Sequence, residues 1–373
     1  SHTSPVLPFV IIIMARIPSI SKPPISRILH VGRPIAFALG IVILLSSLVI
    51  GILGENVVEV YRILVLSAFG SLDDFGYVLF NATPLIFTGL AVTIGFKCGL
   101  FNIGCEGQLY VGGFAAAWMG FHFNLPAIIL IPFCILAAMV AGAGWAAIAG
   151  ILKAKFGVHE VINTIMMNFI AIALTSYFVT EVYQEAGQMI PHTPQISETA
   201  HLPRIAAFLG LIPKSNPLNV TFLLALIAAL FCQFFLKRTQ YGYELRLVGD
   251  APEVATYGGI NVGAVTVWTM MLSGAIASLA GVWDVMGYRH RFLDNFSPGF
   301  GYTGIAAALL GRNHPFGVCL AAVLFGTLNK GALDVEILMD VPRELFLIAQ
   351  AVLIICLASI QLKWQGGTLS KTA

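Results

Sequence analysis

The length of its uncharged, apolar runs limits most strongly how this chain can fold. Between Gly107 and Leu152 there are 46 consecutive residues without an Asp, Glu, Lys or Arg. A helix needs about 20 apolar residues to cross a bilayer, so this run allows two crossings with Phe121–Pro126 as the turn. The other runs that predict crossings are Pro34–Gly54, Phe75–Phe96, Val161–Thr180, Ser215–Leu236, Val262–Trp283, Phe296–Gly311, Pro315–Asn329 and Leu345–Leu362. We therefore expect an all-α, polytopic membrane helix bundle of about ten transmembrane segments, some of them broken or re-entrant.

Composition narrows the function classes. The chain is 58% hydrophobic and 10% charged, whereas soluble domains carry about 25% charged residues. A net charge of +2 gives no electrostatic indication of nucleic-acid binding, and we expect none. No GxxxxGK[ST] motif is present, so this chain does not bind ATP by that route. The cysteines form no CxxC pair and lie in or beside apolar segments, so we expect free thiols and neither a metal site nor a cofactor.

Positive charge predicts the orientation in the membrane. With the N-terminus inside, thirteen of the twenty Lys and Arg residues fall in inside segments and seven in outside segments. Lys and Arg accumulate on the cytoplasmic side of membrane proteins, so both termini are expected to be cytoplasmic. The predicted organisation is a basic cytoplasmic arm over residues 1–33, a transmembrane domain over 34–363 and a cytoplasmic tail over 364–373.

The stretch Gly99–Leu109 places polar groups where hydrocarbon is expected. Asn102 and Glu106 are four residues apart, so they share one helix face if the helix is continuous, whereas Gln108 would point elsewhere. Polar side chains at membrane depth face a bundle interior or a water-filled cavity. Asn102, Glu106 and Gln108 are candidates to line a solute path. The alternative is that Glu106 bonds the end of a broken helix and holds two helices together.

Three further amides lie within predicted crossings. Asn81 is near the middle of one, with Pro84 three residues later, and Asn163 and Asn168 lie in another. They are candidates for a solute path, and the alternative is that they hydrogen-bond neighbouring helices. The small residues Ala138, Gly142, Ala146 and Gly150 recur every four positions and predict close helix packing.

A polar segment, Tyr241–Asn261, follows one of the crossings. Asp250 can cap a helix there, Pro252 suits its first turn, and Glu253 completes a capping-box-like pair. Gly258 and the glycine after it would end the helix. The prediction is a short amphipathic cytoplasmic helix that either lies at the membrane interface or docks onto a cytoplasmic partner.

The segment Gly299–Gly317 joins two short apolar pieces at a Gly- and Pro-bearing turn. Interrupted segments of this kind point to substrate sites in transporters. Together with Phe101–Gln108, His159–Asn168 and Glu244–Ala255, this segment resembles the permease subunits of bacterial ABC importers for nucleosides and simple sugars, within the larger group of ribose and branched-chain amino acid permeases. The resemblance covers roughly Asn81 to Lys363, and Cys105 stands where a small aliphatic residue is more usual.

This resemblance implies a multi-pass protein of the bacterial inner membrane that moves a nucleoside or simple sugar and performs no covalent chemistry itself. It implies a cytoplasmic ABC ATPase that hydrolyses ATP, a second permease that is homologous or identical, and an extracytoplasmic solute-binding protein or lipoprotein. It assigns the segment near 243–258 as the helix that contacts the ATPase. The coupling residues implied by it are Tyr243, Glu244, Leu245, Arg246, Gly249, Asp250, Pro252, Glu253 and Ala255.

Two other functions compete with this interpretation. A secondary transporter acting alone would use Glu106 as an ion or proton carrier. An intramembrane enzyme would need catalytic groups at membrane depth, and the sequence contains no HExxH, no GxSxG and no paired aspartates in the predicted crossings.

Overall fold

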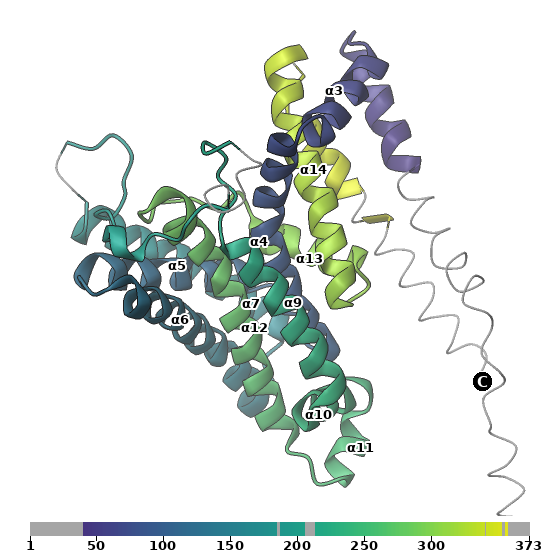
Figure 1. Ribbon diagram of the computed structural model, residues 1–373. Coiled ribbons are helices and arrows are strands. Elements are labelled where there is room, and N and C mark those ends of the chain that lie inside the picture. The colour runs from purple at the N-terminus through teal and green to yellow at the C-terminus, as the bar shows by residue number, and fades with distance from the viewer. Residues whose placement is uncertain (1–39, 185–186, 206–212, 340, 353–354, 357–373) are drawn as a thin grey trace, which may run out of the picture.

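The computed structural model describes residues 40–184, 187–205, 213–339, 341–352 and 355–356, and these form an all-helical bundle (Figure 1). The long helices are α3 (Val57–Phe69), α4 (Leu72–Lys97), α5 (Cys105–His122), α6 (Ala127–Phe156), α7 (Glu160–Tyr177), α9 (Thr221–Arg238), α12 (Val262–Asp284) and α14 (Pro315–Met339). The shorter helices are η1 (Phe178–Val182), η2 (Glu198–Ala200), α10 (Gln240–Asp250), α11 (Pro252–Tyr257), η3 (Val285–Arg289) and α13 (Phe300–Leu310). An apolar helix at Gly40–Ile52 and a helix at 344–352 complete the described elements.

Six of the described helices are long and apolar enough to cross a membrane, which agrees with a multi-pass membrane protein. They are α4, α6, α7 with η1, α9, α12 with η3, and α14. The prediction of about ten crossings is therefore supported only for these six, while Gly40–Ile52 and α13 are shorter apolar helices. The predicted arm (residues 1–33) and tail (364–373) lie outside the described residues.

Helix α4 forms the centre of the bundle. Its most apolar window is 89% buried inside the protein, and it packs against α12, α13 and α14. The Thr88 hydroxyl donates a hydrogen bond to the Phe300 carbonyl oxygen at 3.0 Å, which ties α4 to the start of α13. The Ser273 hydroxyl of α12 donates to the Ala91 carbonyl oxygen at 2.7 Å. In Figure 1, α5 and α6 lie to one side of α4, and α3 and α14 lie to the other.

The stripe of small residues on α6 packs as predicted, against α12. A Cβ added to Gly142 would lie only 2.6 Å from the Gly274 carbonyl oxygen and 2.6 Å from the Ser278 Cβ. Gly150 meets Val267 and Met270 of the same partner helix in the same way. The small residues therefore set how closely the backbones of α6 and α12 approach.

One predicted boundary is wrong, and one helix was not expected. The segment expected to end at Asn329 continues as α14 to Met339, because Lys330 pairs with Asp334 one turn later and the helix carries both charges. Helix α3 was not expected, because its 13 residues are too few to cross a bilayer and include the charged Glu59 and Arg62.

The polar segment after α9 contains two short helices where one was expected. Asp250 is the last residue of α10, and the N-cap of α11 is Ala251, which makes no side-chain capping bond. The prediction that Asp250 caps the helix is therefore wrong, because Thr239 begins a helix eleven residues earlier by accepting the Gly242 N–H. The predicted stop is confirmed, since Gly258 is the C-cap of α11.

Candidate solute pathway

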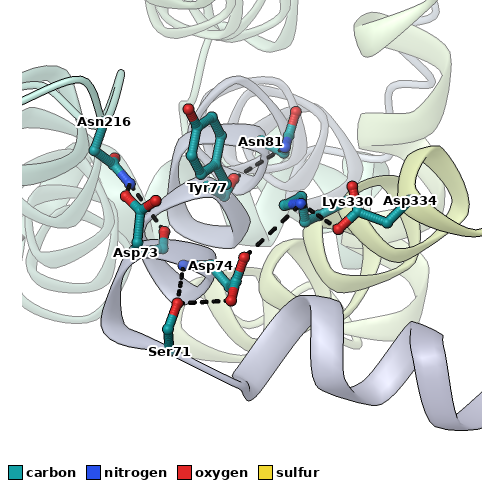
Figure 2. A network of polar contacts seen from close by, with 8 residues as sticks. All are labelled: Ser71, Asp73, Asp74, Tyr77, Asn81, Asn216, Lys330 and Asp334. Atoms are coloured by element: carbon teal, nitrogen blue, oxygen red, sulfur yellow. Dashed lines mark hydrogen bonds and ion pairs between the residues drawn. The ribbon is translucent and has the colours of Figure 1, made fainter. Parts of the chain in front are cut away.

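A polar network joins the first turn of α4 to α14 (Figure 2). Ser71 caps α4 by accepting the Asp74 N–H at 3.0 Å, and its hydroxyl donates to Asp74 Oδ2 at 2.6 Å. The Lys330 ammonium lies 2.5 Å from Asp334 Oδ2 on its own helix and 3.9 Å from Asp74 Oδ1 on α4. The ammonium also lies 5.6 Å from the centre of the Tyr77 ring. One lysine thus bridges two central helices.

The same network extends along α4. Asn216, from the loop before α9, donates to the Asp73 backbone oxygen at 2.9 Å and to its carboxylate at 2.7 Å. One turn after Tyr77, Asn81 donates to the Tyr77 carbonyl oxygen at 2.9 Å (Figure 2).

Asn81 and Lys330 both face a pocket between α4, α13, α14 and the helix 344–352. Its volume is about 260 Å³, slightly below the range of about 300–1,000 Å³ that is typical of ligand pockets. The polar residues that line it are Asn81, Thr303, Asn329, Lys330, Arg343 and Gln350. Across the pocket wall, the Gln350 amide donates to Asn329 Oδ1 at 3.1 Å. We name this space the polar pocket.

A second concentration of polar groups lies inside the bundle, where α5 begins. The helix starts at Cys105 after a break, so Asn102 precedes it and does not share a helix face with Glu106. Asn102 and Gln108 instead exchange two hydrogen bonds, at 3.0 and 3.1 Å, and Asn102 donates to the Ser273 hydroxyl at 2.8 Å. The expectation that Gln108 points elsewhere is wrong, because the break folds residue 102 back over the first turn.

Glu106 and Asn168 connect this break to two other helices. Glu106 is 3% exposed, and its Oε2 accepts the Gly301 N–H of α13 at 2.6 Å. Asn168 accepts the Gly107 N–H at 2.8 Å and donates to the Ile103 carbonyl oxygen at 3.0 Å. The Gly107 N–H in the first turn of α5 thus finds its partner on α7, and Asn168 fixes the break before α5 in place.

Asn163 makes a comparable contact from α7 to α6. Its side-chain amide donates to the Ala149 carbonyl oxygen at 3.2 Å. Of the six candidate pathway residues, Asn81 alone lines the polar pocket, while Asn102, Glu106, Gln108, Asn163 and Asn168 are buried in interhelical hydrogen bonds.

Sequence reasoning missed most residues of the polar pocket. Asn329 and Lys330 fell at the predicted end of a crossing, and Gln350 lay within an apolar run where it was not singled out. The signal that could have found them is the run Asn329–Asp334, which carries polar and charged residues one turn apart.

The opposite end of the bundle is rich in basic residues. Burial and the neighbouring charges of Lys237 and Lys97 lower the pKa of His314, which shows that the turn between α13 and α14 lies close to the ends of α4 and α9. Lys153, near the end of α6, pairs with Glu160 at 2.9 Å. Helices α10 and α11 form this end of the molecule in Figure 1.

The predicted coupling residues divide between packed and exposed positions. Leu245 and Ala255 are buried, and Gly249 fits against the backbone of Lys97–Gly99. The partly buried members include Glu244 and Arg246, whose guanidinium donates to the Gly242 carbonyl oxygen at 3.2 Å. The exposed members are Tyr243, Asp250, Pro252 and Glu253. Val254 and Tyr257, which were not among the predicted residues, are 57% and 92% exposed on α11.

Comparison with known proteins agrees with this architecture. A guanosine ABC transporter permease protein of Bacillus subtilis is 39% identical over 90% of this chain and 95% of its own length. A glucose ABC transporter permease protein of Haloferax volcanii is 36% identical over 87% of each chain, and a nucleoside ABC transporter permease protein of Lactococcus lactis is 33% identical over 79% of this chain and 80% of its own. No solved structure gave a significant match.

The family model that matches covers residues 75–358, from the first turn of α4 to beyond the helix 344–352, and so includes both the polar pocket and the α10–α11 end. The chain belongs to the family of permease components of the branched-chain amino acid transport system type.

Proposed function

We propose that the chain is a permease subunit of an ABC importer for a neutral nucleoside or simple sugar in the bacterial inner membrane. The relatives are described as permeases for guanosine, nucleosides and glucose. The observation that carries the proposal is the pair of α10 and α11, which lies at the basic end of the molecule (Figure 1) and leaves Val254 and Tyr257 exposed on α11. Exposed aromatic and aliphatic side chains on a short helix suit a groove on a partner protein.

The basic end is the cytoplasmic face in this proposal, as the positive-inside rule requires. Residues 1–33 and 364–373 then form cytoplasmic segments around a permease domain at 34–363. The ATPase partner binds there, a second permease packs alongside, and an extracytoplasmic binding protein delivers the solute to the opposite end.

The polar pocket supports a solute path that starts at that opposite end. It lies beside the middle of α4 and the C-terminal half of α14, and Asn81 is the predicted pathway residue that lines it. Asn102, Glu106, Gln108, Asn163 and Asn168 then act on the path indirectly, by fixing the helices that would move against one another when the opening switches sides.

The stand-alone secondary transporter is the weaker alternative. A proton carrier must exchange its proton with both sides, yet Glu106 is buried and holds the Gly301 N–H at 2.6 Å. A carboxylate that accepts a backbone N–H in this way is used as a structural acceptor.

The experiment that tests the proposal replaces exposed α11 side chains. Tyr257→Ala, alone or with Glu253→Lys, should leave membrane insertion intact but uncouple solute-stimulated ATP hydrolysis from transport in the reconstituted complex. Tyr177→Ala is the matched control, because Tyr177 is also an exposed tyrosine (56%). It is the last residue of α7, at the end of that helix away from the basic end of the molecule. Co-purification of the ATPase with normal coupled transport in the α11 variants would show that α11 is not the docking site.

A further inference from the structure

We propose that Lys330 is the specificity-determining residue of the polar pocket, and that its ammonium donates a hydrogen bond to a carbonyl oxygen on the heteroaromatic base of a nucleoside. This inference rests on the proposed import function and narrows its solute from nucleoside or sugar to nucleosides whose base carries a carbonyl group.

The first argument is the hydrogen-bonding capacity of Lys330. An ammonium group carries three N–H donors. Asp334 takes one at 2.5 Å, and Asp74 at 3.9 Å is an ion-pair partner beyond hydrogen-bond distance. The Lys330 side chain is 13% exposed, and the residue lines the polar pocket. Donor capacity therefore remains for a molecule in the pocket.

The second argument is charge. The carboxylates of Asp74 and Asp334 balance the positive charge of Lys330, and neither aspartate lines the pocket. Of the described lining residues, two are cations (Lys330 and Arg343), three are amides and none is a carboxylate. Lys and Arg side chains donate hydrogen bonds and accept none, so these two cations favour a solute that presents acceptor oxygens to them.

The third argument is the shape of the apolar walls. Phe300 and Phe346 line the pocket together with Leu85 and Leu333. Aromatic side chains bind the flat faces of nucleobases by stacking, and this tolerates any base. A base also presents carbonyl and ring-nitrogen acceptors at its edge, which Lys side chains recognise on guanine. A free sugar offers neither a flat aromatic face nor such an edge.

The position of Lys330 also places a bound base beside a contact between two helices. The two carboxylate partners of Lys330 lie on different helices, Asp334 on α14 and Asp74 on α4. A base that accepts the remaining N–H of the ammonium therefore lies beside the point at which Lys330 joins α4 to α14.

The experiment compares inosine with adenosine in the reconstituted transporter complex with saturating binding protein and ATP. The two solutes differ at C6, which bears a carbonyl in inosine and an amino group in adenosine, and at the adjacent N1, which carries a hydrogen only in inosine. Lys330→Met should lower the inosine-to-adenosine uptake ratio by about tenfold or more relative to wild type, the value of one hydrogen bond to a charged group. The binding protein is the same in both measurements, so a change in the ratio belongs to the permease.

Lys214→Met is the matched control, because Lys214 is an exposed lysine in the loop before α9, outside the pocket; its ratio should equal that of wild type. Lys330→Gln combined with Asp334→Asn keeps a neutral hydrogen-bonding pair and serves if Lys330→Met fails to assemble. It should also lower the ratio, but by less than Lys330→Met, because the Gln amide donates a weaker, neutral hydrogen bond. An unchanged ratio in the assembled variant, or equal loss of both solutes, would show that Lys330 is structural and overturn the inference.

The wild-type complex separates this inference from the proposed function. ATP-dependent uptake of a free sugar with no nucleoside uptake would overturn the inference while leaving the import function standing. Absence of any ATP-dependent uptake would overturn both.

Discussion

The packing of α6 on α12 allows a comparison between two glycines two residues apart. Gly142 faces α12, and a Cβ there would lie 2.6 Å from the Gly274 carbonyl oxygen. Gly144 is on the same helix, and a Cβ there meets nothing within 4 Å. Gly142→Ala and Gly144→Ala therefore make the same chemical change with opposite packing consequences.

The magnitude follows from the contact distances. An ordinary Cβ contact begins at 3.4 Å, so Gly142→Ala requires α6 and α12 to separate by about 0.8 Å or to distort. Overpacking of this kind costs about 1–3 kcal/mol of unfolding free energy. Gly144→Ala should instead gain about 0.5–1 kcal/mol, because alanine loses less backbone entropy than glycine on forming a helix.

The assay is the midpoint of unfolding of each purified variant in mixed detergent and SDS, followed by the loss of helical circular dichroism. We expect the order Gly144→Ala, wild type, Gly142→Ala, from most to least stable. A midpoint for Gly142→Ala at or above that of Gly144→Ala would refute the close approach of α6 and α12.

Two further predictions concern single side chains. Glu106→Gln should retain transport, because its side-chain oxygen can still accept the Gly301 N–H. Glu106→Ala should lose about 1–3 kcal/mol of stability, because it leaves that N–H unpaired. Transport by Glu106→Gln is measured in proteoliposomes, and its complete loss would favour the proton-carrier alternative. Burial and the charges of His201 and Arg204 lower the pKa of His290 from 6.5 to about 4. Between pH 6.5 and pH 4, His290 is therefore protonated in the unfolded chain and neutral in the folded chain. The free energy of unfolding should therefore fall as pH decreases from 6.5 to 4. The variant His290→Asn should weaken this dependence in unfolding midpoints measured across the same pH range, and Asn tolerates the positive φ of 58° at this position. An equal pH dependence in the variant would exclude His290 as its source.

The membrane-spanning architecture could be predicted from sequence because it depends on local composition. The uncharged run Gly107–Leu152 falls on α5 and α6, with the turn at 123–126, and α6 is one of the six helices long and apolar enough to cross a membrane. The small-residue stripe on α6 was interpretable for the same reason, since helical periodicity places Gly142 and Gly150 on one face.

The details of the polar segments could not be predicted in the same way. Whether Asn102 and Glu106 share a face depends on where α5 begins, and that is set by partners distant in sequence, Asn168 and Gly301. Asp250 has the sequence context of a cap, yet Thr239 starts the helix earlier and Asp250 ends it. In both cases a tertiary contact or a competing cap decides between local alternatives.

The polar pocket shows the same limit. Lys330 and Asp74 are separated by most of the chain and meet only because α4 packs against α14. Asn81 was singled out because it lies in an apolar crossing, whereas Gln350 occupies an equally apolar run and was overlooked. A single sequence identifies which polar residues lie at membrane depth but not which of them face the same space.

The central claim, that this chain is the membrane-spanning part of an ATP-driven importer, is tested most directly by solute accumulation in proteoliposomes that contain the permease complex. ATP is supplied on the α11 side, and the proton gradient is set independently. The account predicts accumulation that requires ATP and persists when the proton gradient is dissipated. Accumulation that follows the proton gradient and continues without the ATPase would contradict it.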